Sequence, residues 1–292
     1  MMSLLLIRFM LTFLGLAIIA AQASWRASDP PPAGGTEVKT EEAVVTGDPA
    51  TAEELLDRLE QSEKTLENFE AGIHRRTFDA IFEETQVYLG DIYFDVNRAG
   101  AGRRFAILFK RKGTLVEADG APRMNLRDRN EHYIFDGQWL VEKNVEDKQF
   151  IKRRMARPGE KFDPLSLDGP LPMPFGQPKS EVLRLFDVEL VQAPAEDSFL
   201  FTQLNNVWGL RLAPKPGTRG AEQFETVTVF YDRATLLPAG IDAVKVGGNR
   251  DMVWLFRQKR NAGFDAKLVD VSEPTEPGWK IDRRDWQEEK PR

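Results

Sequence analysis

The spacing of apolar residues along this chain changes near residue 69 from a helical period to a strand-like period. Between Ala52 and Phe69, apolar side chains recur every three or four residues, which predicts an amphipathic helix of about 18 residues. Asp48-Pro49 and the Thr51–Glu54 pair each offer a start for this helix. Because the apolar stripe is narrow, the helix is expected to lie on another element rather than to be buried on all sides.

After residue 69, apolar and polar residues alternate, which is typical of strands with one buried face. Turn-forming residues separate most of these segments, and Asp136-Gly137 is typical of a two-residue hairpin. The predicted strands of the first half are Ala71–Ile81, Val87–Val96, Arg103–Lys112, Glu131–Asp136, Gln138–Asn144 and Gln149–Met155. After a short helix at about Ser180–Phe186, the predicted strands are Val207–Ala213, Phe224–Asp232, Ala239–Val246, Met252–Lys259 and Phe264–Ser272.

Consecutive short strands joined by tight turns predict an antiparallel meander. A meander of this length is expected to curl, so the fold class is mainly β, an incomplete barrel covered by the N-terminal helix and a short lid helix or loop. No boundary divides residues 48–285, which are therefore interpreted as a single domain, followed by a tail at 286–292.

The N-terminal segment has the features of a secretory signal. An apolar run follows the single charge of Arg8 and ends at Ala21-Gln22-Ala23, which predicts cleavage after residue 23. The run is shorter than the roughly 20 residues of a membrane span. An uncleaved anchor in the inner membrane, facing the periplasm, is the alternative. Residues 24–47 are rich in Pro, Gly, Thr and Glu and are interpreted as a flexible linker.

Charge and composition narrow the possible functions. The net charge is −6, and removal of residues 1–23 takes away only Arg8 and leaves −7, so nothing indicates nucleic acid or an anionic lipid surface. The chain has no Cys, and His74 and His132 lack metal-ligand spacing; each is interpreted as a strand residue facing solvent or a polar partner. Nucleophile, phosphate-loop and dinucleotide motifs are absent. These residue types and motifs favour a binding protein without cofactor or metal over an enzyme. An exported hydrolase that uses a Ser nucleophile with one of the two His stays open as an alternative.

Large apolar side chains occupy the alternating strand positions instead. They either fill a barrel core or line a partly filled concave face, leaving an apolar pocket that suits acyl chains. The candidate lipid-binding residues of such a pocket are Ile92, Phe94, Phe105, Ile107, Phe109, Trp139, Trp254 and Phe256.

A Pro-rich loop follows the sixth predicted strand and carries five large apolar residues. They are Leu165, Leu167, Leu171, Met173 and Phe175. Since loops normally lie at the surface, such side chains predict a flap over the mouth of the cavity, with a loop packed on the barrel as the alternative.

The order of these features resembles the LolA-like family of periplasmic outer-membrane lipoprotein carriers. The resemblance covers about residues 50–282 and rests on the leading helix, the strand Gln86–Phe94, the hairpin Tyr133–Leu140 and the closing Pro277–Ile281. It implies an incomplete barrel lidded by helices, and a monomer without a cofactor. Family carriers often have an Arg-Pro pair whose Arg holds the lid closed. Here Arg98-Ala99 is the nearest match, so Arg98 is counted with the lid.

The resemblance also implies the function and the partners. The leading hypothesis is a soluble periplasmic carrier that receives acylated lipoprotein or another lipid from an inner-membrane exporter and delivers it to an outer-membrane acceptor. The alternative is a sensor or interaction module of the cell envelope, which uses the same fold to bind a protein or lipid signal without transport.

Overall fold

A computed structural model describes residues 47–97, 100, 102–118, 121–155, 157 and 177–285. The predictions for the signal peptide at 1–23, for almost all of the linker at 24–47 and for the tail at 286–292 lie outside these residues. The same holds for Arg98 and for the apolar loop residues Leu165, Leu167, Leu171, Met173 and Phe175.

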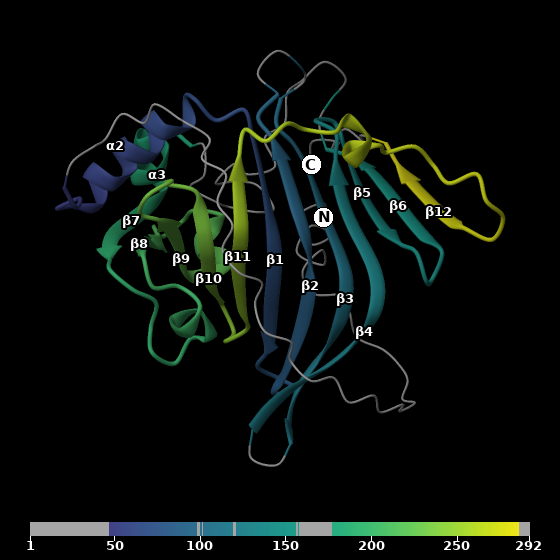
Figure 1. Cartoon of the computed structure of the whole chain (residues 1–292), viewed down its shortest axis with the longest axis horizontal. Helices are drawn as coiled ribbons and strands as arrows, with labels where there is room; N and C mark the ends of the chain where they lie inside the picture. The colour runs from purple at the N-terminus through teal and green to yellow at the C-terminus, as the bar shows by residue number, and fades with distance from the viewer. Residues whose placement is uncertain are drawn as a thin grey trace, which may run out of the picture. The chain divides into compact units, whose positions relative to one another are not determined.

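Twelve strands form one sheet in the order β12-β6-β5-β4-β3-β2-β1-β11-β10-β9-β8-β7 (Figure 1). The first half contributes β1 (Asn68–Asp79), β2 (Glu84–Asp95), β3 (Arg104–Ala118), β4 (Ala121–Phe135), β5 (Trp139–Asn144) and β6 (Gln149–Arg154). The second half contributes β7 (Phe186–Val191), β8 (Val207–Pro214), β9 (Phe224–Asp232), β10 (Pro238–Lys245), β11 (Arg250–Arg260) and β12 (Lys280–Arg284). The sheet curls but does not close, which confirms the predicted incomplete barrel.

The order of the strands joins two meanders. Strands β1 to β6 form one antiparallel meander and β7 to β11 form the other, and they meet where β1 pairs with β11. The last strand, β12, instead pairs in parallel with β6 at the far edge. The chain therefore returns, at its end, to the meander with which the sheet began.

Two glycines fit positions where neighbouring strands approach closely. A Cβ atom on Gly90 of β2 would lie 2.1 Å from the carbonyl oxygen of Leu108, and one on Gly113 of β3 would lie 1.8 Å from that of Asn125. Gly90 also stands at a register shift between β2 and β3. Such shifts bend a strand and increase its twist, which favours curling of the sheet.

The N-terminal helix α2 (Ala52–Glu63) is shorter than the sequence predicted. It begins where predicted, because the Thr51 side chain accepts a hydrogen bond from the Glu54 N–H at 3.2 Å and Glu54 accepts one from the Ala50 N–H at 2.9 Å. It ends earlier because the chain enters β1 at Asn68. The apolar period continues across this junction, since Leu66 and Phe69 are both buried.

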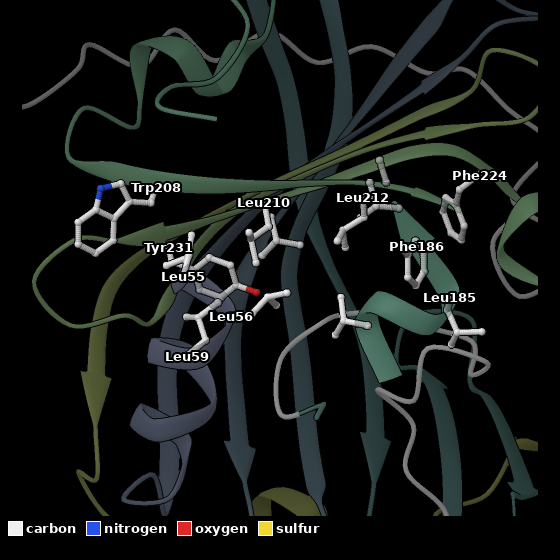
Figure 2. Packing of buried hydrophobic residues seen from close by; sticks show 14 residues of the cluster. Leu55, Leu56, Leu59, Leu185, Phe186, Trp208, Leu210, Leu212, Phe224 and Tyr231 are labelled. Carbon is white, nitrogen blue, oxygen red and sulfur yellow. The ribbon is translucent and has the colours of Figure 1, made fainter. Parts of the chain in front are cut away.

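Helices α2 and α3 (Lys179–Leu185) pack on one face of the sheet, over β7 to β10. Leu55, Leu56 and Leu59 lie beside Leu210 and Tyr231 (Figure 2). We call this side the helix face.

On the opposite face, two short 3₁₀ helices cover different parts of the sheet. Helix η1 (Phe199–Thr202) and the residues after it pack against Val207 and Phe230, in the second meander. Helix η3 (Ala266–Val269) packs on the first meander. The predicted strand Phe264–Ser272 is therefore wrong, because its apolar side chains lie on the sheet rather than alternating within it.

Candidate functional site

Strand register places the eight candidate pocket residues on two different faces. Residues paired across antiparallel strands point to the same side of a sheet. Ala243, which packs with α2 and α3, pairs with Asp251; Asp251 pairs with Thr77, and Thr77 with Gln86. Alternate residues of β2 from Gln86 onward, including Ile92 and Phe94, therefore lie on the helix face. Their partners on β3, Ile107 and Phe105, lie there too, as does Phe109 opposite Gly90.

The other three candidates lie on the opposite face. Trp254 packs with the residues around η1, and its ring centroid is 4.7 Å from that of Phe256. Trp139 neighbours Leu140, whose partner Phe135 belongs to the helix face, so the Trp139 side chain points away from it. Alternation groups residues within one strand, but the sequence does not give the register between strands. The pocket residues predicted from sequence thus divide five to three.

The five residues on the helix face join two further aromatic residues in a continuous apolar surface of the sheet, in which Phe94, Phe105, Phe109 and Phe135 are at most 4% exposed. Phe105 lies 5.7 Å from Phe135, and Phe109 lies 6.2 Å from Tyr133, between ring centroids. We call this surface the aromatic floor; it comprises Ile92, Phe94, Phe105, Ile107, Phe109, Tyr133 and Phe135. Among the described residues, the core cluster built by α2 and α3 extends over β7 to β10 and includes no residue of the floor.

A row of charged side chains borders the floor on the same face. It runs across β10, β11, β1, β3 and β4, and we call it the charged belt; its members are Lys245, Asp251, Arg75, Lys112, Glu131 and Arg129. Tyr88 lies within it, with the Arg75 guanidinium 5.6 Å and the Lys112 ammonium 4.9 Å from its ring centroid. The sequence does not reveal this belt, because each member looks like an ordinary polar strand residue.

The Asp251 carboxylate is held by two cations and a hydroxyl. It is 5% exposed and accepts hydrogen bonds from Arg75 Nη2 at 2.8 Å and Thr77 Oγ1 at 2.7 Å, while Lys245 Nζ lies 2.5 Å from its other oxygen. Burial alone would raise the pKa of Asp251, but Arg75 and Lys245 hold it well below its ordinary value. Asp251 is therefore a carboxylate at neutral pH.

Glu131 is held less completely. Its side chain is 3% exposed, and Oε1 lies 3.4 Å from both Lys112 Nζ and Arg129 Nε. The second oxygen, Oε2, is buried without a hydrogen-bond donor. Burial lowers the pKa of Lys112 even though Glu131 opposes that change. A buried carboxylate oxygen without a donor is costly, which makes this end of the belt a place where a ligand donor would be stabilising.

A polar groove lies at the end of α2. Its volume is about 250 Å³, and it is lined by Glu60, Glu63, Lys64, Val96, Arg103, Gln177 and Pro178. Arg103 Nη2 lies 3.8 Å from Glu63 Oε1, which links the helix to the beginning of β3. Arg98, the arginine that the sequence counts with the lid, lies outside the described residues. Arg103, five residues later, contacts the covering helix α2.

Both histidines lie on the opposite face of the sheet, His74 on β1 and His132 on β4. His74 is 7% exposed on the opposite face, where its ring centroid lies 5.0 Å from that of Phe199 and Arg76 Nε donates to it at 3.4 Å. Burial, followed by the charge of Arg76, lowers the pKa of His74 to about 4. Burial also lowers the pKa of His132. Within the described ranges, no three His, Asp or Glu side chains form a group that could hold a metal, and none of the helices has the length and apolar character of a membrane span.

No protein-family model and no curated protein matches this chain. Solved structures of similar fold include an uncharacterized conserved protein from Thermus thermophilus (14% identity, TM-score 0.39, 80% of this chain and 99% of that one). A putative outer membrane lipoprotein-sorting protein domain from Vibrio parahaemolyticus (8%, 0.35, 75% and 95%) is also similar. So is a LolA superfamily protein from Nitrosomonas europaea (10%, 0.33, 76% and 98%). The likeness bears on the fold alone, and the LolA-like family stays a resemblance drawn from the sequence.

Proposed function

We propose that this protein is a lipid carrier of the periplasm that shields acyl chains on the aromatic floor. The observation that supports it is the floor itself, a set of large apolar side chains on the face that carries the helices. Burying one acyl chain is favourable by about 0.8 kcal/mol per methylene group. A chain lying along the floor would thus gain affinity without any catalytic group, and the protein would act as a carrier rather than an enzyme.

The cargo in this proposal is an acylated lipoprotein or another lipid. It is received from an exporter in the inner membrane and passed to an acceptor in the outer membrane. The residues that contact its chains are those of the floor, while Trp139, Trp254 and Phe256 lie on the other side of the sheet and have no part in binding.

The second candidate is a sensor or interaction module. The observation in its favour is β7, which stands at an edge of the sheet and pairs with β8 on one side. An extended peptide adds to such an edge through main-chain hydrogen bonds. In that case the protein would bind a protein segment and would not transfer lipid.

Native mass spectrometry of the protein purified from its own periplasm separates the two. We expect one acylated peptide or phospholipid per chain, identified by extraction of the bound material. A ligand-free mass, together with no uptake of added lipid, would contradict the carrier and favour the interaction module.

A further inference from the structure

The charged belt has a charge and a hydrogen-bonding pattern that point to a particular class of lipid. In the described residues, four cations of the belt, Arg75, Lys112, Arg129 and Lys245, contact three carboxylates: Asp251, Glu131 and the more exposed Asp147. Glu84 also acts on Tyr88 of the belt, and Arg127 acts on Lys112, so the belt is a dense group of cations and carboxylates on the same face as the floor. Arg and Lys side chains grouped in this way are the partners that a phosphodiester takes in proteins.

Charge alone does not complete the belt, because one of its carboxylate oxygens lacks a hydrogen-bond donor. Glu131 Oε2 is buried and has no donor, whereas every cation of the belt contacts a carboxylate. A phosphate has oxygens that accept but cannot donate to Glu131. A hydroxyl group on the same ligand could donate, so the missing partner is a donor attached close to the negative group.

The position of the belt agrees with this chemistry. Glu131 is the cross-strand partner of Phe109, so the belt begins where the aromatic floor ends. Along β2, Phe94 of the floor and Tyr88 of the belt are six residues apart, or about 20 Å. A ligand with long apolar chains on the floor would thus place its polar end at the belt.

We propose that the charged belt binds the headgroup of an anionic phospholipid whose headgroup carries hydroxyl groups, as phosphatidylglycerol does, with Glu131 accepting a hydrogen bond from a hydroxyl. Lys112 and Arg129, the two cations beside Glu131, contact the phosphodiester, and the acyl chains lie on the aromatic floor. This inference rests on the proposed function, and it names the cargo as a phospholipid rather than a lipoprotein.

The test compares three lipids with identical acyl chains on the full-length protein. Phosphatidylglycerol has the phosphate and the hydroxyl donors, phosphatidylmethanol has the phosphate alone, and diacylglycerol has neither. We expect phosphatidylglycerol to bind about tenfold more tightly than phosphatidylmethanol, which corresponds to one hydrogen bond to a charged group. Diacylglycerol should bind more weakly than both.

A pair of matched variants assigns the effect to Glu131. In Glu131→Gln, the preference for phosphatidylglycerol over phosphatidylmethanol should fall from about tenfold to below about threefold, because a neutral acceptor is weaker. Glu70→Gln is the control: Glu70 lies on the opposite face and pairs with the exposed Lys259, so the tenfold preference should remain. If Glu131→Gln does not fold, the lipid series on the wild-type protein decides alone.

The outcomes separate this inference from the proposed function. Equal binding of phosphatidylglycerol and phosphatidylmethanol overturns the headgroup assignment while leaving the carrier standing. An unchanged preference in a folded Glu131→Gln variant overturns the role of that residue. Failure of all three lipids to bind overturns both proposals together.

Discussion

Asp251 shows what a single buried charge requires of its neighbours. Its carboxylate is matched by Arg75 and Thr77 of β1, more than 170 residues away in the sequence, and by Lys245 across the β10–β11 hairpin. From the sequence, Asp251 follows a Gly-Gly turn and looks like a solvated turn residue. The burial and the partners arise only when the strands pair, so alternation along one strand could not reveal them.

We expect Asp251→Asn to destabilise the protein by about 3–5 kcal/mol, because it leaves Arg75 and Lys245 without their buried counter-charge. Urea unfolding at pH 7 measures this change. Asp187→Asn is the control: its side chain is 77% exposed and its nearest cation is 3.8 Å away, so it should cost less than about 0.5 kcal/mol.

The same substitution should alter how stability depends on acid. The pKa of Asp251 is lower in the folded state than in the unfolded state, so its contribution is complete above about pH 4 and is lost as the pH falls further. Wild-type stability should therefore drop between about pH 4 and pH 2 by more than that of Asp251→Asn. Parallel slopes for the two proteins would show that the carboxylate does not carry the effect.

His74 gives a second pH prediction. Here the folded state favours the neutral form of the side chain, whereas for Asp251 it favours the charged form. The pKa of His74 is lowered to about 4, so the folded state holds the ring neutral while the unfolded state protonates near pH 6.5. Stability contributed by the neutral ring is complete above pH 6.5 and decreases as the pH falls toward 4. An NMR titration of the two histidines should give His74 a midpoint near pH 4; a midpoint near 6.5 would show that the ring is accessible to solvent.

At the scale of elements, the sequence predicted what local patterns determine. The helix beginning at Ala52, the short second helix and ten of the strands lie close to their predicted positions. The outer part of β4, residues 121–130, was missed because Met124 and Leu126 are its only large apolar side chains and most of the others are polar. Strand β12 was missed because its residues are mostly exposed and it is recognisable only beside β6.

For the candidate site, the sequence predicted which residues share a face within one strand or between neighbouring strands, but not which distant strands share a face. Alternation grouped Ile92 with Phe94 and Phe105 with Ile107 and Phe109, and those groups are confirmed as sharing a face. It could not join or separate groups from distant strands, which is why Trp254 was placed with them.

Gly90 tests how the curl of the sheet depends on one position. We expect Gly90→Ala to destabilise the protein by about 3 kcal/mol, because the new methyl group would meet the backbone of β3 rather than a movable side chain. Thermal unfolding followed by circular dichroism measures this. In the control Gly220→Ala, the new methyl group would lie 3.3 Å from the Pro214 ring and 3.7 Å from the Phe186 ring, so this variant should unfold within a few degrees of wild type.

At the scale of the whole molecule, the two faces of the sheet should respond differently to a buried charge. Ile92 is a half-buried residue of the floor, and Ile92→Asp places a carboxylate there, which should weaken lipid binding at least about tenfold. Trp254→Asp introduces the same group on the opposite face and should leave lipid binding unchanged once folding is verified. If Trp254→Asp lost lipid binding while Ile92→Asp kept it, the lipid would bind on the opposite face of the sheet, and the assignment to the floor would be wrong.

The route of the chain after β11 has a consequence for biosynthesis. Residues 264–279 lie across the first meander, where Val269, Phe264 and Trp279 pack against Ala106, Ile134 and Phe150, and β12 then completes its edge. Those residues are made after everything they cover. Until they emerge from the ribosome, the apolar side chains on this face of the first meander are exposed. A nascent chain, or one shortened before residue 264, should therefore be a substrate for chaperones and proteases.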